Sequence, residues 1–317
     1  MLDIKHQMRE TKQKPRLIVI VGPTCAGKTE IAVNLARRWG GEIISADSMQ
    51  VYRFMDIGTA KPTLEDRNIA KHHLVDVVNP DETFNAAMFI EHARGIISTL
   101  HDQRKPIFVV GGTGLYVKVL FGGLLDGPGA DENLRNFYRE KLRMYGNSYL
   151  YEKLKQRDER AAGQIKPNDA VRIIRALEVL ELSGTSIIEK QGAHCFRERR
   201  YERLQIGLTV ERPRLFDRIE QRTEKMVKNG LVDEVCKLLD MGYHEQLKPM
   251  RTFGYKYIVK YLKGLCDIKE AKRLINRDTK HYAKRQMTWF GADNNIEWFS
   301  PGDISIMERR IQGFLLP

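Results

Sequence analysis

Residues 22–29 form the pattern of a phosphate-binding loop, in which two glycines and a Lys-Thr pair stand at fixed spacing. An apolar, β-branched run at 17–21 precedes the loop, and helical spacing of apolar residues follows it at 30–39. In this context backbone N–H groups surround an anion at a helix N-terminus, a lysine adds charge, and a hydroxyl can bind Mg²⁺. We therefore expect a di- or triphosphate here, with Thr29 as the Mg²⁺ ligand. The residues of this loop are Gly22, Pro23, Thr24, Cys25, Ala26, Gly27, Lys28 and Thr29.

Asp47 is the second candidate for chemistry, because it ends a second apolar run, at 42–46. An acid beside a phosphate-binding loop can hold Mg²⁺ through water or act as a general base. The alternative is that Asp47 caps the segment that follows it. A third apolar run, at 106–110, ends in Gly-Gly-Thr rather than in a carboxylate. The acid that ATPases place there is absent, which makes motor and signalling NTPases poor candidates and leaves enzymes that act on a small phosphorylated substrate.

Three further groups of residues have two interpretations each. The glycines of 111–116 allow either a close approach of substrate or a tight turn between strand and helix. Arg218 and Arg222 share one face of a predicted helix, where one could reach a phosphate or both could pair with Glu220 or Glu224. A basic face on the last long helix could follow an RNA backbone, but a solvated face is the more common explanation. That face consists of Arg273, Arg277, Lys280 and Lys284.

Aromatic and histidine residues give weaker signals. Trp289 and Phe290 follow the basic face, and we predict that they pack in the core rather than stack on bases. His72 and His73 have no acidic or cysteine partner at metal-ligand spacing, so we interpret them as structural.

The elements that position these residues alternate between strand and helix. Strands are predicted at 17–21, 42–46 and 106–110, with helices at 30–39 and 84–101 between them. This alternation predicts an α/β fold with a doubly wound parallel sheet, in which ligands bind beyond the carboxyl ends of the strands. Asp47 and Thr113 should therefore lie near the phosphate-binding loop.

The middle of the chain has a different pattern. Helical spacing without a convincing strand covers 131–200, with helices at 133–145, 148–156 and 168–182. A strand at 203–210 and helices at 214–229, 231–241 and 268–290 follow. We predict a P-loop core at 1–125, an inserted all-helical subdomain at 126–200, and completion of the core by 201–317.

Charge and composition narrow the choice of partner and compartment. Residues 1–130 carry a net charge of +2 and residues 131–317 carry +10, which favours a polyanionic partner, although a generally basic surface fits equally well. The four cysteines, at 25, 195, 236 and 266, have no paired spacing, so we expect neither a zinc site nor disulfides. No apolar run approaches the roughly 20 residues of a membrane span. We expect a cytoplasmic protein.

With these residues the chain resembles the bacterial tRNA dimethylallyltransferases, also called tRNA isopentenyltransferases, over nearly its whole length. The most specific segment is 45–62, which contains ADSMQVYR at 46–53 and MDIGTAKP at 55–62. The resemblance also rests on residues 22–29, 72–74, 111–116, 167–169, 172–178 and 285–290.

The resemblance implies transfer of the dimethylallyl group from dimethylallyl diphosphate to N6 of a tRNA adenosine. The target is the adenosine 3′ of the anticodon in tRNAs that read codons beginning with U. Asp47 would take the N6 proton. Thr24 would lie against the bridging region of the diphosphate, and Thr29 would bind Mg²⁺. The leaving diphosphate would be held by Lys28, Arg222 and the loop amides. The adenosine side would be lined by Asp47, Ser48, Met49, Gln50 and Thr113. The anticodon stem-loop would be held by Arg135, Val171, Arg172, Ile173, Ile174 and Arg175.

This reaction explains the missing acid, because it breaks a carbon–oxygen bond and needs no water aligned on a γ-phosphate. We expect a monomer without an obligate protein partner. The chain departs from the family pattern at Cys25, where Ala or Ser is usual, and at Gly291, where Arg is common. Two other functions compete with the transfer. One is a kinase of a small hydroxylated metabolite with Asp47 as base, and the other is an RNA-binding protein that only retains the fold.

Overall fold

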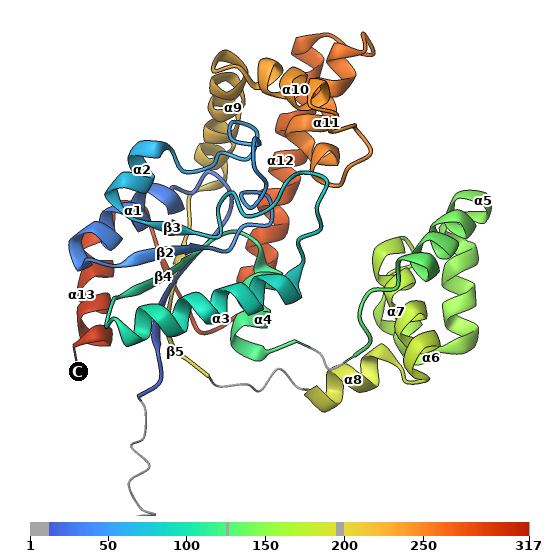
Figure 1. The fold of residues 1–317 in the computed structure, drawn as a ribbon, viewed down its shortest axis with the longest axis horizontal. Helices are drawn as coiled ribbons and strands as arrows, with labels where there is room; N and C mark the ends of the chain where they lie inside the picture. The colour runs from blue at the N-terminus through green and yellow to red at the C-terminus, as the bar shows by residue number, and fades with distance from the viewer. Residues whose placement is uncertain (1–12, 125–126, 195–199, 317) are drawn as a thin grey trace, which may run out of the picture. The chain divides into compact units, whose positions relative to one another are not determined.

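The computed structural model describes residues 13–124, 127–194 and 200–316, so Cys195 lies outside the described residues. The chain divides into two compact units (Figure 1). One unit comprises Met1–Leu120 and Arg200–Pro317, and the other comprises Phe121–Arg199. None of the helices within the described ranges has the length and apolar character to cross a membrane.

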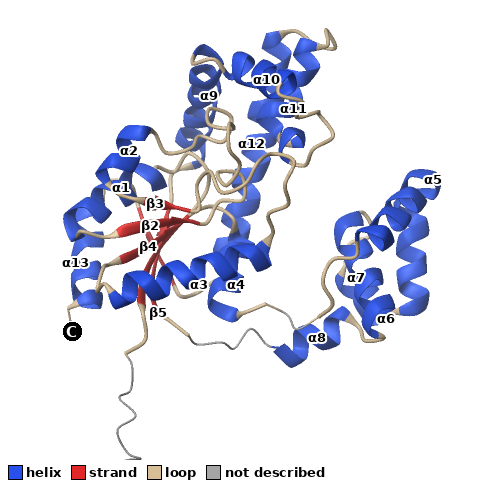
Figure 2. Ribbon diagram, viewed as in Figure 1, coloured by secondary structure: helices blue, strands red, loops and turns tan. Residues whose placement is uncertain are grey.

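The first unit is built on a six-stranded parallel sheet with the order β3-β2-β4-β1-β5-β6. Figure 2 shows strands of this sheet in red among the blue helices. The predicted α/β class with a doubly wound parallel sheet is confirmed. β1 is central, because Leu17 pairs with Ile107 of β4 on one side and with Arg203 of β5 on the other. The strands are β1 (Arg16–Val21), β2 (Glu42–Ser45), β3 (His72–His73), β4 (Ile107–Val110), β5 (Glu202–Leu208) and β6 (Ile296–Phe299).

The sheet is buried on both faces, as continuous apolar strands require. Every residue of β1 from Leu17 to Val21 is fully buried. On one face, Ile18 and Ile20 pack with Leu35 of α1 and Ile311 of α13. The helices of this unit are α1 (Lys28–Trp39), α2 (Leu64–Ile69), α3 (Ala86–Asp102), α4 (Gly114–Gly122), α9 (Arg212–Lys228), α10 (Leu231–Asp240), α11 (Phe253–Leu262), α12 (Ile268–Phe290) and α13 (Ile304–Leu315), with a 3₁₀ turn at Pro249–Arg251.

The strands β3 and β6 were not predicted. β3 has two residues, too few to show a period, and it extends the sheet only through its pairing with β2. β6 has only four residues, Ile-Glu-Trp-Phe, which show no alternation, and its partner β5 lies far away in sequence. The helices α2, α4, α11 and α13 were also missed, whereas the predicted helix 268–290 agrees with α12.

The second unit has its own core, formed around Tyr138, Leu150, Leu154 and Leu177. Over its described residues, 127–194, every regular element is a helix: α5 (Glu132–Arg157), α6 (Glu159–Gln164), α7 (Ala170–Ser183) and α8 (Ile187–His194). Gly146 interrupts α5 with φ 78° and ψ 178°, a conformation open to glycine. The two arms of α5 correspond to the two helices predicted at 133–145 and 148–156.

Candidate active site

The phosphate-binding loop connects β1 to α1 and is shaped by two glycines. Gly22 has φ 137°, and a Cβ there would lie 2.5 Å from the carbonyl oxygen of Leu208 in β5, so only glycine fits. Gly27, with φ 95°, stands at the N-cap of α1 and has no side chain to cap the helix. The N–H groups of the first turn therefore stay available to an anion.

Lys28 lies beneath this loop. Its Nζ donates hydrogen bonds to the carbonyl oxygens of Gly22 (3.0 Å) and Pro23 (2.7 Å). Burial lowers the pKa of Lys28 to about 8, although the charges of Asp47 and Cys25 oppose this shift. The ammonium is thus held inside a loop that does not fully compensate its charge.

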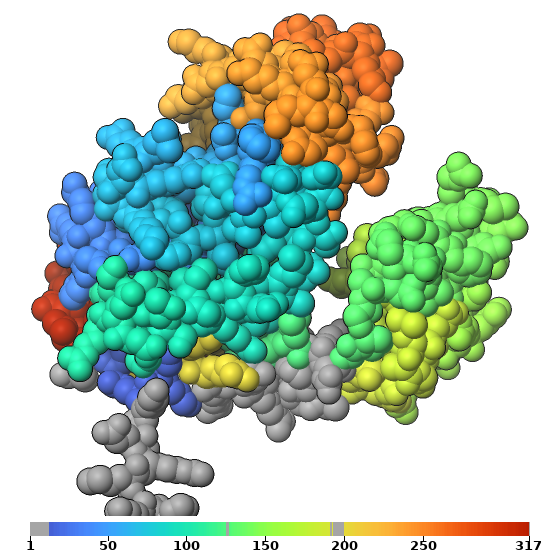
Figure 3. Space-filling model, in the orientation of Figure 1, coloured from blue at the N-terminus to red at the C-terminus, as the bar shows by residue number. Residues whose placement is uncertain are grey.

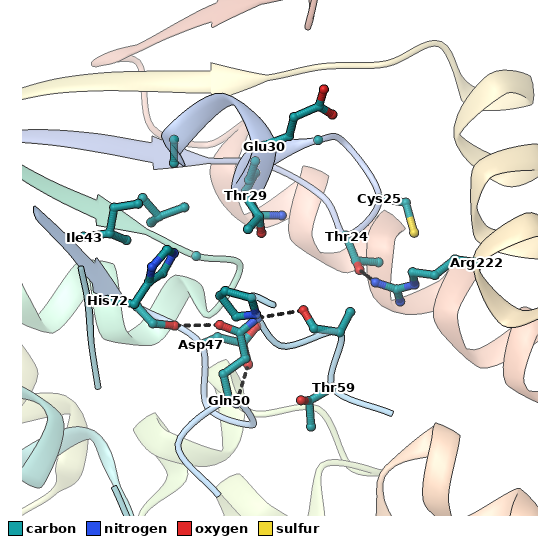
Figure 4. A pocket seen from close by; sticks show the side chains of 18 residues that line it. Thr24, Cys25, Thr29, Glu30, Ile43, Asp47, Gln50, Thr59, His72 and Arg222 are labelled. Carbon is teal, nitrogen blue, oxygen red and sulfur yellow. Dashed lines mark hydrogen bonds between the residues drawn. The ribbon is translucent and has the colours of Figure 1, made fainter. Parts of the chain in front are cut away.

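A cavity of about 280 Å³ lies against the loop and α1 (Figure 4). It joins segments from distant parts of the chain, because the ends of β2 and β4 and a side chain of α9 line it together with the loop. The predicted site residues among its lining are Thr24, Cys25, Gly27, Lys28, Thr29, Asp47, Gln50 and Arg222.

Thr24 is held from two helices of the C-terminal segment. Arg222 of α9 donates to its Oγ1 at 2.8 Å, and the two side chains point toward each other in Figure 4. Gln286 of α12 accepts the Thr24 N–H at 2.8 Å and donates to the carbonyl oxygen of Gly112 at 2.9 Å. Gln286 thereby ties the loop to the turn after β4. It falls within the resembling segment 285–290, but its residue type alone gave no sign of this role.

Arg218 and Arg222 both turn toward the loop. Arg218 donates to the carbonyl oxygen of Cys25 at 3.4 Å. Glu220 and Glu224 instead pair with lysines of α12, at 2.6 Å to Lys280 and 2.8 Å to Lys272. The geometry therefore favours the phosphate interpretation of this arginine pair over surface ion pairs.

Asp47 uses one oxygen to shape its own turn. Its Oδ1 accepts the N–H groups of Met49 (2.8 Å) and Gln50 (3.4 Å), so the capping alternative holds for this oxygen. Among the described residues, Oδ2 accepts no hydrogen bond. The carboxylate is thus oriented by its local backbone while one oxygen stays available to a substrate in the cavity.

The turns after β2 and β4 are joined to each other. Thr113 Oγ1 accepts the Ser48 N–H at 3.0 Å, and the Thr113 N–H donates to the carbonyl oxygen of Ala46 at 3.2 Å. A Cβ on Gly111 would lie 2.1 Å from that same carbonyl oxygen. Gly111 therefore permits a close approach of two backbone segments, and this junction holds Ser48 beside Thr113.

In the helical unit, the predicted tRNA-binding residues fall into two sets. Arg135 and Arg175 both pair with Glu178, whose side chain is fully buried. Burial raises the pKa of Glu178, but the hydrogen bonds from these two arginines outweigh this effect and lower it. These two arginines therefore also stabilise the unit.

The segment 171–175 is half exposed and half buried. Val171 is 80% exposed, and the side chain of Arg172 is 64% exposed with Asp169 at 3.4 Å. Ile173 and Ile174 lie in the core of the unit. This burial argues against direct RNA contact by the two isoleucines, which instead orient the exposed part of the helix.

The basic face of α12 is largely ion-paired. Arg273 pairs with Glu270, Arg277 with Asp278 and Lys280 with Glu220, as expected of a solvated face. The prediction that the aromatic pair packs in the core is correct for Phe290, which is 3% exposed, and wrong for Trp289, which is 41% exposed. A Cβ on Gly114 would lie 2.2 Å from the indole nitrogen of Trp289, so the ring lies on the turn after β4.

The donor set around Thr29 fits a Mg²⁺ ion only together with a substrate. In the described ranges, no group of three or more His, Cys, Asp or Glu residues could hold a metal by itself. The Thr29 side chain lines the cavity at the start of α1. Mg²⁺ commonly takes few protein ligands and completes its shell with phosphate oxygens and water. Thr29 together with a bound diphosphate would provide ligands of this kind.

Comparison with known proteins points to one family. A family model described as IPP transferase matches residues 50–293, and one described as isopentenyl transferase matches residues 15–78. The chain is 58% identical over 291 residues to tRNA dimethylallyltransferase 2 of Syntrophus aciditrophicus, covering 92% of this chain and 94% of that protein. It is 50% identical over 291 residues to tRNA dimethylallyltransferase 2 of Geotalea uraniireducens, with the same coverage.

A solved structure agrees with these relatives. The full-length tRNA isopentenylpyrophosphate transferase of Bacillus halodurans superposes with a TM-score of 0.70 at 41% identity, covering 95% of this chain and 97% of that chain.

Proposed function

Because the chain belongs to the IPP transferase family, we propose that it transfers the dimethylallyl group of dimethylallyl diphosphate to a tRNA adenosine. The acceptor is N6 of the adenosine 3′ of the anticodon in tRNAs that read codons beginning with U. The products are N6-isopentenyladenosine and diphosphate. One observation carries the proposal: a phosphate-binding loop, Thr24, Arg222 and Asp47 line a single cavity at the carboxyl edge of the sheet.

The loop side of the cavity is suited to a departing diphosphate. The reaction breaks the bond between C1 of the allyl group and the bridging oxygen, so negative charge develops on the diphosphate. The N–H groups of 25–29, the Lys28 ammonium and the Arg222 guanidinium then stabilise that charge. The Thr24 hydroxyl, held by Arg222, is placed to donate to the bridging oxygen.

Asp47 serves the acceptor. The N6 amine is a weak nucleophile and must lose a proton as the new C–N bond forms. The oriented carboxylate takes that proton on Oδ2, and a positioned base of this kind contributes roughly 10²–10⁴ in rate. Ser48, Met49, Gln50 and Thr113 flank the base, because their turns are joined beside Asp47.

Mg²⁺ would be held by Thr29 and the diphosphate, where it supplies further neutralisation of the leaving group. The Lys28 ammonium and the Arg222 guanidinium would share this neutralisation with the ion. We further propose that the protein acts as a monomer in the cytoplasm.

The helical insert, which we place at 126–200, supplies the binding energy for the RNA. The target base must leave the stacked loop, at a cost of a few kcal/mol. Favourable contacts with the anticodon stem-loop by Val171, Arg172 and the arginines around Glu178 offset this cost.

The reaction is tested by incubation with radiolabelled dimethylallyl diphosphate, Mg²⁺ and unmodified bacterial tRNA, followed by nucleoside analysis. We expect label in N6-isopentenyladenosine. Absence of label, together with consumption of ATP in the presence of small hydroxylated metabolites, would replace this proposal with a kinase.

The base role is tested by Asp47→Asn. Asparagine keeps an acceptor oxygen for the Met49 and Gln50 N–H groups, so the turn should persist. We expect turnover to fall by at least about 10² while tRNA and diphosphate still bind. Turnover near that of the unchanged protein would remove Asp47 from the base role.

A further inference from the structure

Glu234, in the first turn of α10, binds the backbone of a segment that is distant in sequence. Its Oε2 accepts the N–H groups of Asp56 (2.9 Å) and Ile57 (2.7 Å), and its Oε1 accepts that of Gly58 (3.0 Å). The Tyr255 hydroxyl also donates to Oε1, at 2.7 Å. A carboxylate offers about four acceptor sites, so these four donors use all of its capacity.

The same segment is pressed onto the Tyr255 ring. A Cβ on Gly58 would lie 2.5 Å from two ring carbons, so the backbone at this point lies directly against the ring. In Figure 3 the blue atoms of the segment around residue 55 lie against the orange atoms of the segment around residue 240. Glu234 and Tyr255 therefore fix residues 56–58 from two directions.

The next residues of the chain form a wall of the reaction cavity. Thr59, Ala60 and Pro62 line it together with the phosphate-binding loop. The Ala60 carbonyl accepts the side-chain amide of Gln50 at 3.3 Å. The Gln50 N–H in turn donates to Oδ1 of Asp47. A continuous series of contacts thus runs from Glu234 through residues 56–60 and Gln50 to the carboxylate of Asp47.

We propose that Glu234 is a positioning residue for the transfer, which holds the wall at 59–62 and, through Ala60 and Gln50, the carboxylate of Asp47. This inference rests on the proposed function. Glutamine cannot replace Glu234, because its amide has one acceptor oxygen and would turn an NH₂ group toward backbone N–H donors.

The first test compares Glu234→Gln with Asp233→Asn. Asp233 is its exposed neighbour in the same helical turn and makes none of these contacts, so the second variant controls for loss of one negative charge near the helix N-terminus. We expect kcat to fall at least about tenfold in Glu234→Gln, because small misplacements of a reacting group cost that much or more. The Kd of inorganic diphosphate should stay within about twofold, because the phosphate-binding loop is not touched. Asp233→Asn should leave both unchanged.

A double-mutant cycle separates positioning from general damage to the fold. If Glu234 acts through Asp47, Glu234→Gln should lower single-turnover rates less than about threefold in an Asp47→Asn background. The same factor in both backgrounds would overturn the proposal. If Glu234→Gln does not fold, Glu234→Asp takes its place, because it keeps the charge but shortens the side chain by one methylene. An unchanged kcat in Glu234→Asp would also overturn the proposal.

Hydrogen exchange makes failure of this inference distinguishable from failure of the proposed function. In Glu234→Gln the amides of residues 56–58, and also those of 49 and 50, should exchange faster than in the unchanged protein. Unaltered exchange at 49 and 50 would break the link to Asp47 whatever the reaction is. Absence of transfer by the unchanged protein, with faster exchange at these amides in the variant, would count against the proposed function alone.

Discussion

Lys28 offers a test of the phosphate site by pH. Burial lowers its pKa to about 8, so above that pH the amine of the free protein is neutral. An anion then binds only if the proton is taken up again, and we expect the Kd of inorganic diphosphate to rise about tenfold for each pH unit above 8. The measurement is titration calorimetry from pH 7 to 10. Lys28→Arg keeps its charge over this range. The difference in log Kd between the two proteins at each pH therefore cancels the effect of the ionisation of diphosphate itself. Parallel plots of log Kd against pH for the unchanged protein and Lys28→Arg would contradict the prediction.

Arg172 is the exposed cation of the predicted RNA-binding segment. We expect Arg172→Gln to weaken tRNA binding and to reduce the slope of log K against log salt by about one, because one fewer counterion is released. Arg160→Gln is the matched control, since Arg160 is an exposed arginine of the same unit with a comparable ion pair, 3.5 Å from Glu189. Binding isotherms at several salt concentrations give both slopes. An unaltered slope for Arg172→Gln would place the RNA on another surface.

At the scale of residues, the sequence predicts the site where its chemistry is local. The residues of the phosphate-binding loop are adjacent in the chain, and Asp47 follows a recognisable strand. Arg222 could be named only as one of two candidates. Gln286 and Glu234 could not be found, because their partners are backbone groups of segments 262 and 176–178 residues away. A glutamine or glutamate on a helix gives no sign of which distant N–H it accepts.

Among the elements, the junction of β2 and β4 is the most sensitive to added volume. Gly111→Ala would place a methyl group 2.1 Å from the Ala46 carbonyl oxygen, which only a backbone shift could relieve. We expect a loss of about 1–3 kcal/mol in the free energy of unfolding. Gly95→Ala, in the exposed interior of α3 with open space around it, should instead add about 0.5–1 kcal/mol. Urea unfolding followed by tryptophan fluorescence measures both, and a loss for Gly111→Ala no larger than that of a surface substitution would be evidence against this junction.

The elements also differ in how well the sequence predicts them. The continuous apolar run of β1 and the long helical period of α12 were predicted close to their true ends. β3 was missed because two residues have no period, and it exists only because Ile43 and Ile44 of β2 offer it a partner. The division of α5 was predicted, and Gly146 supplies the conformation that a continuous helix would not adopt.

On the scale of the whole molecule, two separate cores predict two separable unfolding reactions. Leu177 is fully buried in the core of the helical unit. Leu177→Ala should cost about 2–5 kcal/mol in that unit alone. The three tryptophans, Trp39, Trp289 and Trp298, all belong to the other unit. In Leu177→Ala we therefore expect the unfolding transition followed by far-ultraviolet circular dichroism to begin at lower denaturant than in the unchanged protein. The transition followed by tryptophan fluorescence should not shift. Leu35→Ala is the converse control and should shift the fluorescence transition, while transitions that moved together would show one cooperative unit.

The central place of β1 has a consequence for synthesis of the chain on the ribosome. β1 ends at Val21, but its second edge is covered only by β5, which begins at Glu202 and is therefore translated much later. At about 5–20 residues per second, the nascent chain carries a bare apolar strand edge for roughly 10 to 40 seconds. During that time the whole helical insert emerges and can fold, whereas the sheet cannot close. Chains that stall before residue 208 would present an open strand edge to other chains, which makes them natural clients for chaperones that bind extended apolar segments.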